Sequence, residues 1–142
     1  MRSVNRRAFL ATAGPVFTLF PGASGVEAAK RPTGDTEVWV RTELYFGSNH
    51  PNGEVTDAQF RGFVDSEVTR LFPEGFTILT GYGQFKTSEG AIIRERSRVL
   101  ILFYPPQQQD VNRKITELRD LYKKAYAQES VLRADSYSFV SF

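Results

Sequence analysis

The residues of this sequence best suited to chemistry are charged and aromatic side chains that recur at short spacing along two stretches of chain. In the first stretch, Arg41, Glu43 and Tyr45 stand at every second position. In the second stretch, residues 94–98, Glu95 stands between Arg94 and Arg96, and Arg98 follows two positions later. A glutamate can act as a general base, and arginines bind anionic groups or stabilise developing negative charge. These residue types predict either a binding site for a small anionic ligand or a cofactor-independent isomerase or lyase with a glutamate base.

Other kinds of catalytic or metal site lack the residues they need. The chain has no cysteine and a single histidine, His50, which excludes thiolate ligands, disulfides and a histidine-based metal cluster. His50 lies among Gly, Asn and Pro residues, a setting typical of a solvated turn. No serine lies in a nucleophile elbow, and the glycines of 81–83 are not followed by a helix, as a phosphate loop requires. We therefore expect neither a metal nor a cofactor.

The first half of the domain predicts a strand followed by a helix. Apolar residues occupy alternate positions over 37–46, which indicates a half-buried strand, and the turn-forming stretch 47–53 follows it. Thr56 and Gln59 have the spacing of a capping box, so we expect a helix to begin near Asp57. The apolar residues of this helix are Phe60, Phe63, Val64, Val68, Leu71 and Phe72.

The second half predicts a hairpin, a helix and a last strand. A strand over 76–86, in which the glycines of 81–83 mark a bulge or bend, leads by a short connection to a long strand over 92–104. Asp110 can cap a second helix, and the last strand is expected over 131–142. The apolar face of the second helix comprises Val111, Ile115, Leu118 and Tyr122, with Ala125 and Tyr126 as further candidates.

The resulting order, β-α-β-β-α-β, predicts an α+β fold, a ferredoxin-like sandwich. In this fold a four-stranded antiparallel sheet carries both helices on one face. The right-handed crossover rule places the first and third strands at the centre of the sheet and the second and fourth at its edges. The opposite face, which we call the open face, has no helix over it.

Side-chain alternation divides the charged residues of each strand between the two faces of the sheet. If the three arginines of 94–98 join Arg41, Glu43 and Tyr45 on the open face, this face has the arginine and aromatic content typical of interfaces. We expect such a face to hold a small anionic ligand, with Glu43 orienting an arginine, or to form a homodimer. A plainer alternative stays open, in which Glu43 and Glu95 only pair with neighbouring arginines across strands.

A second polar cluster lies where the second helix meets the last strand. Gln128, Glu129 and Ser130 occupy this point, and Glu129 near a helix carboxyl end is electrostatically unfavourable without a specific partner. The alternative is that these residues only terminate the helix. Tyr82 is an amphipathic side chain that would also suit an interface. The candidate binding residues are therefore Arg41, Glu43, Tyr45, Tyr82, Arg94, Glu95, Arg96, Gln128 and Glu129.

Residues 1–28 have the order of regions found in an export signal. Arg6 and Arg7 are followed by Phe9 and Leu10, as in twin-arginine signals, and the apolar stretch beyond them is too short to span a bilayer. Cleavage is expected after Ala28, with the next residue as the alternative. The general Sec route also stays open, because Asn5 and Ala11 depart from the motif, which usually has Ser or Thr at the first position and often Lys at the second. We expect export to the periplasm or the extracellular space, transient contact with the twin-arginine machinery and signal peptidase, and no stable membrane anchor.

The charge of the chain changes once the signal is removed. Residues 1–28 contain three arginines and one glutamate, so the remaining chain has 15 basic and 15 acidic residues. A domain of balanced charge lacks the basic footprint that phosphate-backbone binding requires, so nucleic acid is not an expected partner. We expect a short flexible leader over 29–36 and a single domain over 37–142.

Five segments of the chain stand out by pattern and order: Glu43-Leu44-Tyr45-Phe46-Gly47, Phe72-Pro73-Glu74-Gly75-Phe76-Thr77, Gly81-Tyr82-Gly83-Gln84-Phe85, Ile93-Arg94-Glu95-Arg96-Ser97 and Tyr126-Ala127-Gln128-Glu129-Ser130-Val131. Together they resemble a bacterial domain-of-unknown-function family, the one numbered three-five-seven-four. The resemblance spans most of the mature domain and implies a small protein, often exported, without implying an activity. Several of the segments could converge in a βαββαβ sheet.

Overall fold

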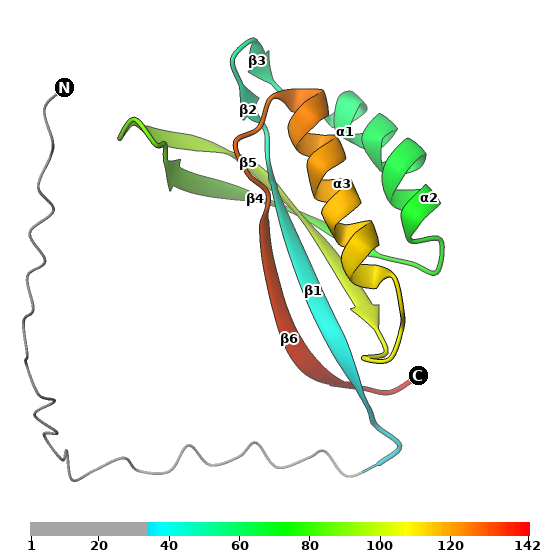
Figure 1. Cartoon of the computed structure of the whole chain (residues 1–142). Helices are drawn as coiled ribbons and strands as arrows, with labels where there is room; N and C mark the ends of the chain where they lie inside the picture. The colour runs from blue at the N-terminus through cyan, green and yellow to red at the C-terminus, as the bar shows by residue number, and fades with distance from the viewer. Residues whose placement is uncertain (1–33) are drawn as a thin grey trace, which may run out of the picture. The chain divides into compact units, whose positions relative to one another are not determined.

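The central feature of the structure, a computed structural model that describes residues 34–142, is one four-stranded antiparallel sheet (Figure 1). Its strands are β1 (Glu37–Gly47), β4 (Thr77–Lys86), β5 (Ile92–Tyr104) and β6 (Leu132–Val140). They lie in the order β4-β5-β1-β6, so the first and third long strands are central, as predicted. The predicted export signal, with Arg6, Arg7, Phe9, Leu10 and Ala28, lies outside the described residues, as does most of the predicted leader 29–36.

Two helical segments cover one face of this sheet. The first consists of α1 (Asp57–Phe63), a π-helical turn (Val64–Val68) and α2 (Thr69–Leu71), and the second is α3 (Val111–Tyr126). Figure 1 shows both segments on the same side of the sheet, so the predicted α+β, ferredoxin-like βαββαβ arrangement is confirmed.

The amino end of α1 forms as its sequence predicts. The Thr56 side chain accepts a hydrogen bond from the Gln59 backbone N–H, and the Gln59 side chain accepts one from the Thr56 N–H, so the capping box is complete. The middle turn differs from the expected α-helix, because the Thr69 backbone N–H bonds to the Val64 carbonyl five residues back.

The second helix begins in a way that differs from the expected cap. Asp110 has a left-handed backbone (φ 65°), and its side chain makes no capping hydrogen bond. Its carboxylate instead lies 3.6 Å from the Arg113 guanidinium. The predicted apolar face is buried at Val111, Ile115, Leu118 and Tyr122, Tyr126 is half-buried, and Ala125 is exposed. Among residues 34–142, no helix is both long enough and apolar enough to cross a membrane.

The core lies between the helices and one face of the sheet. On β1, Thr42, Leu44 and Phe46 are completely buried, which assigns the even-numbered positions of that strand to the helix side. The Phe46 ring lies 4.6 Å from the Tyr122 ring in an edge-on contact. Aromatic rings from both helical segments complete this cluster through Phe60, Phe63 and Tyr126.

Two local expectations were wrong. The pairing of β4 with β5 runs without interruption through Gly81 and Gly83, so neither glycine forms a bulge. The expected turn over 47–53 contains a small hairpin, in which β2 (Asn49–His50) pairs with β3 (Gly53–Glu54). Gly53 has a φ of 129°, a value that glycine adopts without steric cost. This backbone conformation allows a hairpin where only a turn was expected.

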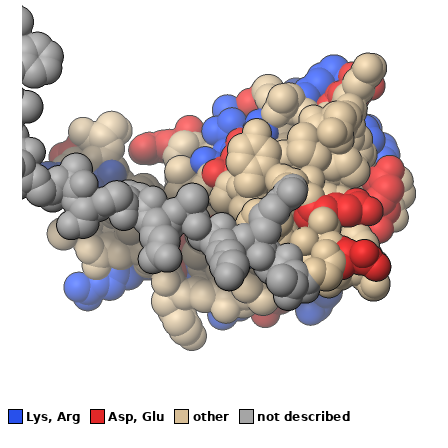
Figure 2. Space-filling view, turned by 90° about the horizontal axis from the view of Figure 1, so that it is seen from below, with Lys and Arg blue, Asp and Glu red and all other residues tan. Residues whose placement is uncertain are grey.

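Charges of both signs are distributed over the described surface. Figure 2 views the molecule from the end at which β1 begins, and basic and acidic side chains are intermingled over the part of this surface that is not grey.

The carboxyl end of α3 gives a test of backbone strain. Ala127 follows the helix with a left-handed backbone (φ 49°), a conformation that glycine adopts without the steric cost that alanine incurs. Ala127→Gly should raise the free energy of unfolding by about 0.5–1 kcal/mol, after allowing for the larger entropy of the unfolded chain. Ala125→Gly, inside the same helix, should lower it by up to about 1 kcal/mol. Urea unfolding measures both, and equal effects would contradict the assigned strain.

Candidate functional site

The sheet sends the predicted site residues to two different faces. On β1, Arg41, Glu43 and Tyr45 alternate with the buried residues and therefore lie on the open face. On β5, Arg98 is buried on the helix side together with Leu100 and Leu102.

This assignment corrects the expectation that the arginines of 94–98 face outward with Arg41. Arg94 and Arg96 share the face of buried Arg98, on the helix side, and Glu95 and Ser97 are on the open face. The physical reason is that Leu100, in the apolar half of β5, is buried against the helices. Because side chains alternate along a strand, this burial fixes the face of every earlier side chain on β5.

The β5 arginines are paired on the helix side. Arg96 Nη1 lies 2.9 Å and Arg98 Nη2 2.7 Å from the same oxygen of Asp57. These two guanidinium groups, Arg98 first, hold the pKa of Asp57 below its ordinary value. Arg94 Nε donates to Gln84 Oε1 at 3.0 Å. These contacts leave Arg41 as the predicted arginine that lies on the open face.

Arg41, Glu43 and Tyr45 form a hydrogen-bonded row along β1. Arg41 Nη2 lies 2.5 Å from Glu43 Oε1, and the Tyr45 hydroxyl donates to Glu43 Oε2 at 2.5 Å. The bond to the Glu43 carboxylate raises the pKa of Tyr45, because ionising the phenol would remove the donated proton. Glu43 is therefore held by groups of its own strand.

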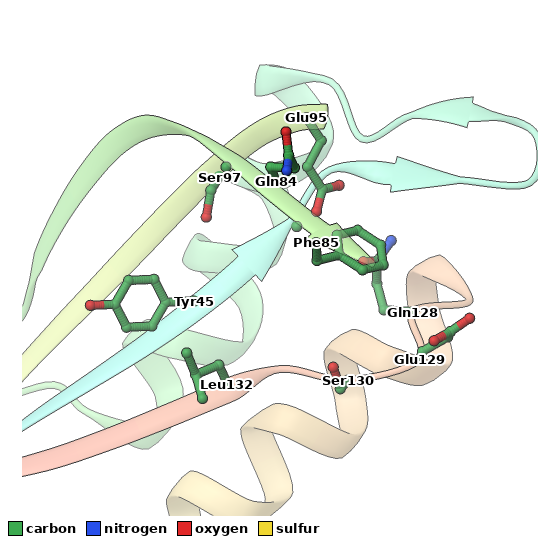
Figure 3. Close-up of a pocket in the computed structure, with 11 residues that line it drawn as sticks. Tyr45, Gln84, Phe85, Glu95, Ser97, Gln128, Glu129, Ser130 and Leu132 are labelled. Carbon is green, nitrogen blue, oxygen red and sulfur yellow. The ribbon is translucent and has the colours of Figure 1, made fainter. Parts of the chain in front are cut away.

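A cavity of about 240 Å³ opens on the open face, beyond the end of this row; we call it the open-face pocket (Figure 3). Strands β1, β4 and β5 form its floor, and the connection from α3 to β6 forms one wall. Its lining residues are Tyr45, Gly47, Gly83, Gln84, Phe85, Glu95, Ser97, Gln128, Glu129, Ser130 and Leu132.

Glu95 packs directly against the last residue of β1. A Cβ atom at Gly47 would overlap the Glu95 carboxylate, so only a glycine permits this approach. Glu95 Oε2 also accepts a hydrogen bond from the Asn49 backbone N–H at 2.6 Å. The carboxylate is thus held at the edge of the pocket by main-chain groups.

The wall formed by the α3–β6 connection is tied to the same backbone. Gln128 Nε2 donates to the Asn49 carbonyl at 2.6 Å. Glu95 thus binds the N–H of Asn49 and Gln128 binds its carbonyl. The buried Tyr122 hydroxyl donates to the Gly47 carbonyl at 2.7 Å, and burial raises the pKa of this phenol. Helix α3 therefore positions both the wall and the floor of the pocket.

The pocket brings together four of the nine candidate residues, namely Tyr45, Glu95, Gln128 and Glu129. Arg41 and Glu43 lie farther along the open face, next to Tyr45. The remaining three candidates, Tyr82, Arg94 and Arg96, lie on the other face of the sheet. The lining residues that were not among the nine candidates are Gly47, Gly83, Gln84, Phe85, Ser97, Ser130 and Leu132. All of them except Leu132 lie in segments that carried the family resemblance.

The lining of the pocket is acidic and partly apolar. Glu95 and Glu129 contribute carboxylates, and no lysine or arginine lines it among the described residues. Tyr45, Phe85 and Leu132 supply apolar surface (Figure 3). Within residues 34–142, no group of three or more His, Cys, Asp or Glu is placed to hold a metal ion.

The family model described as "Protein of unknown function (DUF3574)" matches residues 41–142. The chain belongs to this family. All five segments that carried the resemblance lie inside the matched range. These five segments supply every residue that lines the open-face pocket except Leu132, and four of the five contribute. No curated protein matches the sequence.

Solved structures share the fold at low sequence identity. A phage SAM lyase in complex with S-methyl-5'-thioadenosine aligns with a TM-score of 0.56 and 13% identity, over 81% of this chain and 96% of that chain. The apo SAM lyase aligns with a TM-score of 0.51 and 14% identity, over 81% and 97%. CutA from Synechococcus elongatus gives a TM-score of 0.45 and 15% identity, over 72% and 85%. The lyase alignments support the ferredoxin-like fold.

The contact between Gly47 and Glu95 gives a test of the site geometry. Gly47→Ala should keep the fold, because the group that must move is the end of a flexible side chain, and should push the Glu95 carboxylate away from the Asn49 N–H. The Asn49 amide proton should then move upfield in a ¹⁵N–¹H correlation spectrum. Gly81→Ala is the control, since a Cβ there meets nothing within 4 Å. An Asn49 resonance that moves equally in both variants would contradict the contact.

Proposed function

We propose that this protein is a binding domain that holds a small organic molecule in the open-face pocket. The observation that supports the proposal is that distant parts of the chain line one pocket. Segments of β1, β4, β5 and the α3–β6 connection, far apart in the sequence, meet around one concave surface. Concave sites with a few fixed polar groups among apolar side chains are the usual form of ligand pockets.

The charge of the lining selects the class of ligand. Glu95 and Glu129 line the pocket, and no lysine or arginine of the described chain is among its lining residues. An anion would therefore meet repulsion there, whereas a cationic centre would be attracted. The anionic ligand expected from the arginines therefore does not suit this pocket. Tyr45 and Phe85 offer ring surfaces for a planar group and for a cation. The best-fitting ligand is a small cation that carries a planar ring.

The phage SAM lyase suggests a specific molecule of this class. S-Adenosylmethionine has a sulfonium centre and an adenine ring, and S-methyl-5'-thioadenosine keeps the ring but has no charge. At 13% identity the likeness supports the fold, so the choice of S-adenosylmethionine rests on the acidic and aromatic lining together with that fold.

The two adenosyl compounds test the role of Glu95. The protein should bind S-adenosylmethionine more tightly than S-methyl-5'-thioadenosine in calorimetric titration. Glu95→Gln should weaken binding of the cation by about 10–100-fold, the usual effect of losing a charged contact, and leave binding of the neutral compound unchanged. Glu89→Gln, on the exposed β4–β5 turn, is the matched control. Failure of both compounds to bind, or an equal loss for both in Glu95→Gln, would contradict the proposal.

Catalysis is a second candidate function, favoured by the free oxygen of Glu95. Among the described residues, Oε2 of Glu95 accepts the Asn49 N–H and Oε1 has no hydrogen-bond partner, so Oε1 is available to accept a proton from a bound ligand. An isomerase or lyase would need such a base. Mass spectrometry of S-adenosylmethionine incubated with the protein separates turnover from binding, and turnover should stop in Glu95→Gln.

We further propose that the open face associates with a second copy of the chain. Leu79 is 53% exposed, Phe103 43% and Leu132 61%, and all three lie on this face. Arg41 Nε on the same face is buried with no hydrogen-bond partner among the described residues. In a two-fold contact the same patch of both copies would meet. Such a contact would also enclose the open-face pocket.

Light scattering after size exclusion tests the association. The wild-type domain should have the mass of a dimer, and Leu79→Lys should have the mass of a monomer, because a charge at the interface is not paired. Ile92→Lys is the control, since Ile92 is 62% exposed but belongs to the helix side of β5. A monomeric wild-type domain, or equal effects of both substitutions, would refute this use of the face.

A further inference from the structure

A second cavity lies on the helix side of the sheet, between α1 and β4, and has the opposite charge. It has a volume of about 470 Å³ and is lined by α1, the π-helical turn, β4 and β5. Because it lies across the sheet from the open-face pocket, its ligand and its test are independent of the proposed function.

The basic side chains of this cavity outnumber the acidic ones. Arg61, Arg96 and Arg98 line it, and Asp57 is the carboxylate among its lining residues. Asp57 uses one oxygen to accept hydrogen bonds from both Arg96 and Arg98. The Arg61 guanidinium makes no ion pair or hydrogen bond within the described part of the chain. Glu54, outside the lining, adds a second carboxylate 3.7 Å from Arg96 Nε. The three guanidinium groups therefore exceed these two carboxylates by one positive charge.

Arg98 is the strongest sign of a missing acceptor. Its side chain is only 3% exposed, and Nη1 is buried with no hydrogen-bond partner among the described residues. Nη2 is satisfied by Asp57 at 2.7 Å and by the Val55 carbonyl at 3.2 Å. The guanidinium lies 4.7 Å from the centre of the Phe60 ring, which fixes its plane. Buried donors in native proteins nearly always have a partner, so an acceptor oxygen is expected here.

The rest of the lining defines the size and polarity of what would supply that oxygen. Phe60, Val64 and Ile78 provide apolar surface, and the Thr80 and Tyr82 hydroxyls are available as donors. Tyr82 is 95% exposed and stands at the rim. An arginine group matches the paired oxygens of carboxylate and phosphate, and the apolar surface suits a ring or a short alkyl chain attached to them.

We propose that this cavity is a binding site for a small organic oxyanion, with Arg98 and Arg61 as its anchors. The oxyanion would accept a hydrogen bond from Arg98 Nη1 and pair with Arg61 at the surface, while its apolar part lies on Phe60, Val64 and Ile78. Arg96 was expected to bind an anion on the open face, and its place in this lining assigns that role to the opposite face.

Nuclear magnetic resonance titration with phenyl phosphate and benzoate tests the site. Both probes should give saturable shifts at the Thr80 and Val64 amides and at the Arg98 side-chain NεH, whereas neutral benzyl alcohol should not. The stronger probe indicates whether phosphate or carboxylate is preferred. Arg61→Gln should weaken binding about tenfold. Arg98→Lys should weaken binding further. Because Arg98 is buried, a dispersed amide spectrum of this variant is needed to show that it is folded.

Arg113→Gln is the control, an equally conservative loss of charge on the exposed surface of α3. The proposal is overturned if neither probe shifts the cavity resonances, as expected if Nη1 is satisfied by water alone. It is also overturned if Arg61→Gln and Arg113→Gln bind equally well, which would indicate general attraction to a basic surface.

Discussion

The register between β1 and β5 is the constraint on which both cavities depend. Leu44 pairs with Leu100, and both are buried against the helices, so the core fixes this pairing. A slip of one residue would turn Leu100 to the open face and expose the apolar half of β5 to water. Three positions toward the hairpin, the same register pairs Gly47 with Ser97. Glu95 then reaches the end of β1 because packing at Leu44 and Leu100 leaves its strand no other position.

Gly47 couples the hydrophobic core to the open-face pocket. Its carbonyl accepts the buried Tyr122 hydroxyl on the helix side, and its missing side chain admits the Glu95 carboxylate on the open face. One residue of backbone thus separates the aromatic core from an acidic pocket. A change in the packing of α3 would move the Gly47 carbonyl and, through it, the floor of the pocket, so stability and binding cannot be adjusted independently at this point.

The sequence was sufficient to predict the fold because its periodicities are strong. The capping box at Thr56, the helical spacing from Val111 to Tyr122 and the alternation along β1 each reflect local geometry. The site was only partly predictable, because alternation separates two faces without saying which one the helices cover. For β5, the buried Leu100 decides this, and the decision moved Arg94 and Arg96 away from Arg41. Leu132 lies outside the family segments, and it lines the pocket only through its place in space, for which a single sequence has no signal.

A single strand gives the two faces of this sheet opposite character. The run Arg94-Glu95-Arg96 alternates in charge, and the pleat of β5 sends the glutamate to one face and the arginines to the other. The separation is maintained because each charge is fixed by a group of its own side, Glu95 by the Asn49 N–H and Arg96 by Asp57. In an isolated, solvent-exposed strand of the same sequence, Glu95 and its arginine neighbours could turn toward one another and their charges would partly cancel. Paired into the sheet, Glu95 lines the open-face pocket and Arg96 lines the cavity on the helix side.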